Sequence, residues 1–324
     1  MRFYVCAQVY SMRRNSYNLP RTVFMQRLKL SREFISSYLK EIIPEYEEML
    51  VFIEENGGWI NMPPKMIAII DRLKLHNYPE LYRNKETLAK MLLLAFMSVE
   101  EINTLGAEFK QMPEDEMAHR AEELIQFMGE ASDAFLDNIP DTPEKEQAAK
   151  TAYDELSPEK QAEAVKQAQI AMLAFLASFY STIAIMVHGR KMTDLVQAAE
   201  QGDDDAYCLA VQIDKRILSA LPYFKERYEK AISGVEIDFL DKLHYRITNP
   251  LLRSKIRYKT LWLTFAFLDE SGYLDGSIKH REILDICDEA GVGGYQNRIE
   301  DVGSLSKRLR EYREFQKINQ RSRH

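Results

Sequence analysis

The chain has 324 residues and a formal net charge of −7 at pH 7. At roughly 150 residues per domain, this length predicts two or three domains, and a chain with 46% hydrophobic residues can build a core without disulfide or metal staples. The 13 glycines and 11 prolines are too few for a turn-rich β-sandwich or a collagen-like chain, and the negative charge argues against indiscriminate coating of nucleic acid.

The charge is distributed unevenly along the chain. Residues 1–32 contain seven bases and no acid, residues 113–160 contain fourteen acids and four bases, and residues 304–324 contain seven bases and two acids. Two interpretations stay open. The acidic middle docks on the basic ends, or the basic ends hold an anionic partner.

The three cysteines, Cys6, Cys208 and Cys287, are odd in number, far apart and free of any CxxC spacing. They therefore predict no disulfide framework, a reducing compartment and a cytoplasmic location. We expect them to be buried thiols that act as small hydrophobic residues.

The first residues predict one short strand, because apolar side chains alternate at positions 3, 5, 7 and 9. Polar residues interrupt this stretch, so it does not have the pattern of a secretory signal. The arginine-rich, acid-free start has the composition of a mitochondrial transit peptide. We favour a basic surface segment at the amino terminus.

Helical periodicity and helix-boundary residues dominate from Ser31 onward. Ser31 precedes a helix that Pro44 kinks or restarts, because an interior proline loses a backbone hydrogen bond, and that the glycine pair 57–58 ends. Further helices are expected from about Pro64 and after Asn84.

Two identical start signals follow, at Thr142-Pro143-Glu144 and Ser157-Pro158-Glu159. In each, a hydroxyl caps the helix, the proline takes the first turn and the carboxylate meets the positive end of the helix dipole. The second helix is predicted to run from Pro158 to His188 and to stop at Gly189. At 1.5 Å per residue it would be roughly 46 Å long and could form the centre of the fold.

Residues 170–187 of this helix carry no charge, and roughly 17 apolar residues suffice to cross a bilayer. Internal polar residues, the polar helical run before the stretch and the lack of a second span favour a buried core helix. A membrane-associated protein that uses residues 170–187 stays an alternative. We expect these side chains to be buried in protein: Ala171, Leu173, Phe175, Leu176, Phe179, Ile183 and Met186.

Thr193 opens two short helices joined at Gly202-Asp203, a hairpin that resembles one tetratricopeptide-type unit. Such arrays need about three copies for stability, so we expect a single hairpin and no solenoid. Further helices are predicted at Pro222–Ser233 and Glu236–Thr248.

Catalytic motifs are mostly absent from the sequence. There is no GxxxxGK[ST] phosphate loop, no GxGxxG after a strand, no GxSxG and no HExxH. Glu116 and His119 have the ExxH spacing that is typical of di-iron bundles, and Asp241 and His244 form a looser copy of it. Its acidic surroundings and the shorter aspartate predict no metal. We therefore favour a non-catalytic protein without a cofactor, although a site assembled from distant residues would leave no such motif.

The carboxy-terminal region is the most informative part of the sequence. Residues 242–259 contain six bases and no acid, and an apolar helix, a glycine-bounded turn, a helix from Ser277, a glycine-rich turn at 290–294 and a polar helix follow. Helix, turn and polar helix in this order are typical of a helix-turn-helix. A break at Gly303, with Ser304 capping a further helix, stays open.

On a helical wheel the last segment has an apolar face formed by Val302, Leu305, Leu309 and Tyr312 beside a stripe of cations. Such a stripe can contact phosphates, while Arg298 reaches a base edge. The predicted nucleic-acid-binding residues are Arg253, Lys255, Arg257, Arg298, Arg310, Arg313, Lys317 and Arg321.

Together these patterns predict a mainly α fold: a multi-helix body around a long central helix, with a smaller carboxy-terminal helix-turn-helix-like domain. Its expected parts are a basic amino terminus and helical region (1–112), acidic helices with the central helix and hairpin (113–248), and the basic domain (249–324). The predicted function is regulatory or scaffolding, with DNA or RNA bound through the basic domain. The alternatives are a protein–protein adaptor without nucleic acid and the membrane-associated protein.

Overall fold

The computed structural model describes residues 30–60, 64–137, 142–251, 259–270, 273–274, 280–293 and 299–321. Within these stretches the regular structure is helical, with no strand, which confirms the predicted mainly α fold. The strand expected at residues 3–9 lies outside them.

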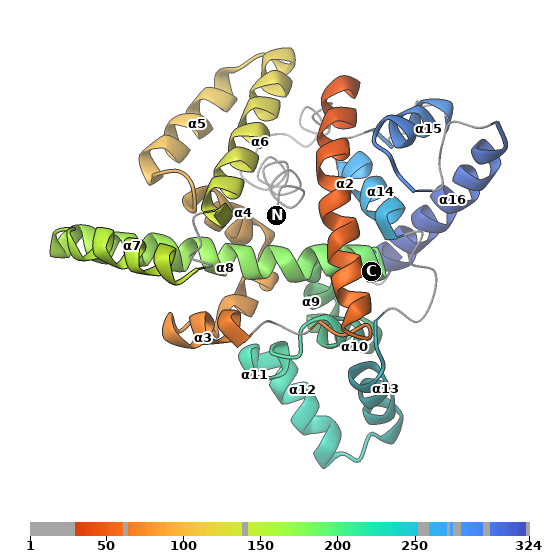
Figure 1. Cartoon of the computed structure of the whole chain (residues 1–324). Coiled ribbons are helices and arrows are strands. Elements are labelled where there is room, and N and C mark those ends of the chain that lie inside the picture. The colour runs from red at the N-terminus through yellow and green to blue at the C-terminus, as the bar shows by residue number, and fades with distance from the viewer. Residues whose placement is uncertain are drawn as a thin grey trace.

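Figure 1 shows the arrangement of the described helices. In chain order they are α2 (Arg32–Glu55), α3 (Pro64–Arg72), the 3-10 helix η1 (Tyr78–Arg83), α4 (Lys85–Leu94), α5 (Val99–Gln111), α6 (Glu114–Asp137), α7 (Pro143–Asp154), α8 (Pro158–His188), α9 (Met192–Glu200), α10 (Asp204–Ile213), α11 (Ile217–Ala220), α12 (Pro222–Ser233), α13 (Ile237–Thr248), α14 (Lys259–Glu270), α15 (His280–Glu289) and α16 (Ile299–Arg321).

The capping residues predicted from sequence set the helix ends. The hydroxyls of Ser31, Thr142 and Ser157 accept hydrogen bonds from backbone N–H groups three residues later. Gly189 ends α8 in the left-handed conformation, at φ +64°. Pro44 does not break α2, because buried residues on both sides of it hold one continuous helix against the core.

Helix α8 runs through the middle of the molecule and packs against α4, η1, α9, α10 and α14 (Figure 1). Of the seven side chains expected to be buried, four are buried, and Leu173, Phe175 and Phe179 are half-buried against the same core. The carboxy-terminal half of α8 is therefore the centre of the core.

In the part of the chain that the structure describes, α8 is also the one helix long and apolar enough to cross a membrane, judged by length and composition alone. Other parts of the protein bury 72% of its most apolar eighteen-residue window. Most of the apolar surface that a bilayer would have to cover is thus already in contact with protein.

The first half of α8 differs from the second. Residues 158–168 are mostly exposed, and the preceding α7 has no buried residue. Together α7 and this half of α8 project from the helical body (Figure 1). They supply a solvated, charged surface and add little to the core.

The carboxy-terminal helices pack on the rest of the fold. α14 contacts α8 and α2, α15 contacts α2, and α16 contacts both α14 and α15. The Ser36 hydroxyl on α2 donates to the Glu289 carboxylate at the end of α15, 2.6 Å away, and Arg32 forms an ion pair with the same carboxylate. The hydrogen bond from Ser36, and then the contact with Arg32, lower the pKa of Glu289. The division into three domains stays a prediction.

Candidate functional site

The last helix has one face in the core. α16 is continuous through Gly303, so the break left open by the sequence does not occur. Leu305, Leu309 and Tyr312 are buried, and the Tyr312 ring lies 5.8 Å from the Trp262 ring and 5.6 Å from the Phe265 ring, both on α14. Because this face is fixed against α14, the opposite face of α16 is directed away from the core.

We call that opposite side the α16 outer face. It contains Lys307, Arg310 and Glu314, and the helix register places positions 317 and 321 on it as well. The Arg310 Nε lies 3.8 Å from Glu314 Oε1, and the two side chains are 71% and 64% exposed. Ion pairs as exposed as this one contribute little to stability. Arg310 can therefore exchange Glu314 for an external anion.

Arg313 lies at the edge of this face and has a structural contact. Its Nη2 donates a hydrogen bond to the backbone carbonyl of Leu274, 3.1 Å away, which ties α16 to the turn after α14. Four predicted binding residues, Arg253, Lys255, Arg257 and Arg298, lie outside the described residues. So do the side chains of Lys317 and Arg321, although their backbone belongs to α16.

The predicted metal-like spacings do not assemble into a cluster. His119 is exposed and its Nε2 lies 3.5 Å from Glu123 Oε1, while Asp241 and His244 are exposed on α13. Among the residues with described positions, no three His, Cys, Asp or Glu side chains come together as metal ligands. The absence of a bound metal stays a prediction for metal analysis of the purified protein.

Two of the cysteines are buried free thiols, as expected. Burial raises the pKa of Cys208 to about 11 and that of Cys287 to about 12. A thiol that stays protonated near neutral pH is a poor nucleophile, so the two groups suit packing better than catalysis.

A buried carboxyl group was not anticipated from the sequence. The hydroxyls of Tyr78 and Tyr82 donate to Asp214 Oδ2, at 2.7 and 3.1 Å, and the Arg216 backbone N–H donates to Oδ1 at 3.0 Å. Tyr180 of α8 stacks on Tyr78 with ring centroids 5.8 Å apart. Desolvation raises the pKa of Asp214 despite these donors. The cluster joins η1, α8 and the α10–α11 junction, which makes it a structural element of the core.

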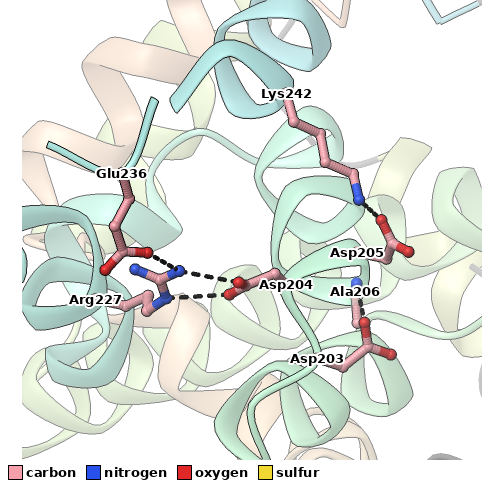
Figure 2. A network of polar contacts seen from close by, with 7 residues as sticks. All are labelled: Asp203, Asp204, Asp205, Ala206, Arg227, Glu236 and Lys242. Atoms are coloured by element: carbon pink, nitrogen blue, oxygen red, sulfur yellow. Dashed lines mark hydrogen bonds and ion pairs between the residues drawn. The ribbon is translucent and has the colours of Figure 1, made fainter. Parts of the chain in front are cut away.

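A second polar network lies at the start of α10 (Figure 2). Arg227 of α12 donates two hydrogen bonds to Asp204, at 3.0 and 2.9 Å, and one to Glu236 at 2.7 Å. Its guanidinium lies 3.9 Å from the centroid of the Phe239 ring. The hydrogen bond to Asp204 is the largest of the causes that raise the pKa of Arg227. This arrangement fixes α12 and α13 to α10.

An open groove of about 640 Å³ lies beside this network. Its lining combines apolar side chains with carboxylates: Asp204, Val235, Glu236, Ile237, Asp238, Phe239 and Lys242. Lys242 forms an ion pair with Asp205 (Figure 2). The sequence indicated only the helix-hairpin turn at residues 202–203, because the partners of the aspartates lie 23 or more residues further along the chain.

Comparison with models of known protein families, with curated proteins and with solved structures finds no match to this chain. The possible functions of the α16 outer face and of the groove are therefore inferred from their own geometry and charge.

Proposed function

We propose that the chain is a non-catalytic regulatory or scaffold protein that binds DNA or RNA through the α16 outer face. One observation carries this proposal: a helix whose apolar face is held against α14 directs a row of cationic positions away from the core. Lys307 and Arg310 are exposed there, and positions 317 and 321 extend the row by register.

The spacing of the row suits a nucleic-acid backbone. Positions 307 and 310, and positions 317 and 321, are three or four residues apart, a spacing that places neighbours on one side of a helix roughly 5–6 Å from one another. Glu314 stands between the two pairs. From position 307 to position 321 the row covers roughly 21 Å, at 1.5 Å per residue, which is long enough to neutralise several phosphates. Phosphate contacts carry no sequence information. We therefore expect weak, salt-dependent binding whose sequence preference is limited to the base that Arg298 contacts.

The remaining predicted cations flank this surface in the sequence. Arg298 directly precedes α16, and Arg253, Lys255 and Arg257 lie in the connection to α14, against which α16 packs. Arg298 is the residue expected to contact a base edge, where its loss would relax the preference at one position by ~1–3 kcal/mol.

The test is a fluorescence-anisotropy titration of a labelled duplex of about 30 bp with the full chain, between about 50 and 200 mM salt. The variant R310A/K317A leaves the Arg313 contact with Leu274 in place. Each phosphate contact contributes about −0.9 to the slope of log K against log salt, so this variant should reduce the magnitude of the slope by about two. Two unrelated sequences should lose affinity equally.

The matched control is K160A/K166A, which removes two cations from the exposed half of α8. It should leave both affinity and slope unchanged. No binding by the full chain at low salt, or an equal loss in the control, would overturn the nucleic-acid function.

A further inference from the structure

A second surface, remote in sequence from α16, lies at the turn between α12 and α13. These helices form a hairpin that projects from the body (Figure 1). At its end Ile232, Val235 and Ile237 are 52%, 67% and 60% exposed, and Tyr228 is exposed one turn earlier on α12. We call the first three residues the hairpin tip. Within the described part of the chain, no packing covers most of these side chains.

The backbone at the tip is strained. The end of α12 is a Schellman turn: Glu236 N–H donates to Ala231 O at 2.9 Å and Val235 N–H donates to Ile232 O at 3.2 Å. The left-handed position of this turn is normally glycine, but here Val235 occupies it at φ +52°. Gly234 stands one residue too early, at φ −83°. A β-branched residue is disfavoured in this conformation.

The backbone strain and the solvent exposure of Val235 together indicate a role in binding rather than in folding. A valine in this position costs stability relative to glycine, and its side chain is mostly in solvent. An observed backbone outlier of this kind supports a hypothesis of function. The apolar side chain at position 235 therefore fits a contact that forms only with a partner.

The groove beside the tip defines the charge of that partner. Four carboxylates stand in or next to it, Asp204, Asp205, Glu236 and Asp238, against two cations, Arg227 and Lys242. The surplus is two negative charges. The Arg227 network holds Asp204 and Glu236 in place before any partner arrives, which lowers the ordering cost of binding.

We propose that the hairpin tip and its groove dock a segment of a partner protein that carries an aliphatic or aromatic side chain flanked by lysine or arginine. The apolar side chain packs on Val235 and Ile237, and the flanking cations approach Glu236 and Asp238. The carboxylates repel nucleic acid, and a second copy would bring two acidic tips together. This surface is separate from the α16 outer face. The docking proposal therefore does not depend on whether the chain binds nucleic acid.

The test begins with a random dodecapeptide library displayed on phage. It is selected against the full chain and counter-selected against the full-length V235D variant. Enriched peptides should carry a net positive charge and at least one large apolar residue. A synthetic peptide from the enriched set should bind V235D and D238K at least about tenfold more weakly, because each variant removes one half of the recognition. V165D, which alters an exposed valine on α8, should bind as the unaltered chain does.

The V235G variant separates binding from folding. Glycine relieves the left-handed strain, so the Tm should rise by about 1–2 °C, while the affinity for the peptide should fall. If the role of Val235 were purely structural, the V235G variant would have a lower Tm. The proposal is overturned if no peptide is enriched over V235D, if enriched peptides are acidic, or if V235D and V165D bind the peptide equally.

Discussion

Two glycines show how backbone conformation alone decides the effect of one substitution. A Cβ added at Gly303, inside α16, or at Gly202, between α9 and α10, meets no heavy atom within 4 Å. Gly202 has φ +96°, whereas Gly303 is helical. Alanine at 303 should therefore stabilise the protein by about 0.5–1 kcal/mol, and alanine at 202 should destabilise it by about 1 kcal/mol or more.

Urea unfolding followed by circular dichroism checks this pair. The midpoint should move up for G303A and down for G202A at an unchanged slope. A downward shift for both variants would show that α16 does not continue through position 303, and an upward shift for both would contradict the left-handed conformation at Gly202.

The buried carboxyl of Asp214 gives a prediction about pH. Desolvation raises its pKa in the folded protein, so the fold favours the protonated form. The stabilisation from that form is complete below the unfolded-state pKa of about 3.9 and is lost as the pH rises through the folded-state value. The side-chain amide of a D214N variant cannot titrate. The stability of D214N relative to the unaltered chain should therefore increase as the pH rises.

The measurement is urea unfolding of both proteins at about pH 4 and about pH 8, with the difference in unfolding free energy taken at each pH. The other carboxylates are common to the two proteins and cancel in this difference. A difference that stays constant, or that moves against D214N at higher pH, would contradict a raised pKa at Asp214.

For α8, one pair of substitutions separates packing against protein from contact with lipid. Ala177 is completely buried, while Ala168, nine residues earlier on α8, is exposed. Methionine at 177 should overpack the core and lower the free energy of unfolding by about 1–3 kcal/mol. Methionine at 168 should leave the free energy of unfolding almost unchanged. Thermal unfolding of A177M and A168M makes the comparison. Equal stability of the two variants would mean that protein does not surround position 177.

Local signals explain why the sequence predicted some elements to the residue. α8 and α12 begin and end as predicted, because proline in the first turn, a capping hydroxyl or a terminal glycine acts within a few residues of the boundary. At Pro44 the local penalty predicted a kink or a restart. The helix does not restart there, because buried residues on both sides of Pro44 hold α2 together as one helix.

The sites were harder to predict, since their partners are distant in the sequence. Tyr78 and Asp214 are 136 residues apart, and Arg227 lies 23 residues from Asp204, so no spacing rule joins them. The apolar face of α16 was predicted because its period is local. The contact between Arg313 and Leu274 was not, because it depends on how α16 packs after the turn.

Apart from α7, the described helices share one hydrophobic core. Buried residues from α2, α8, α10, α14, α15 and α16 belong to a single cluster, and α2 contacts both α14 and α15. Helix α14 contacts α8 as well as α2, so it connects the central helix with α2 and the other carboxy-terminal helices. This packing favours cooperative unfolding of regions 113–248 and 249–324.

The two buried thiols can test that cooperativity within one molecule. Cys208 lies in α10 and Cys287 in α15, one in each region. With pKa values raised to about 11 and about 12, no more than about one thiol in a thousand is ionised at pH 8, and both are shielded from reagents in the folded protein.

Pulse alkylation with N-ethylmaleimide along a urea series, with each cysteine peptide quantified by mass spectrometry, reports the opening of both sites. Because the core is shared, the two labelling midpoints should coincide. Labelling of Cys287 at lower urea, while Cys208 stays protected, would instead show that α14 to α16 unfold as a separate domain.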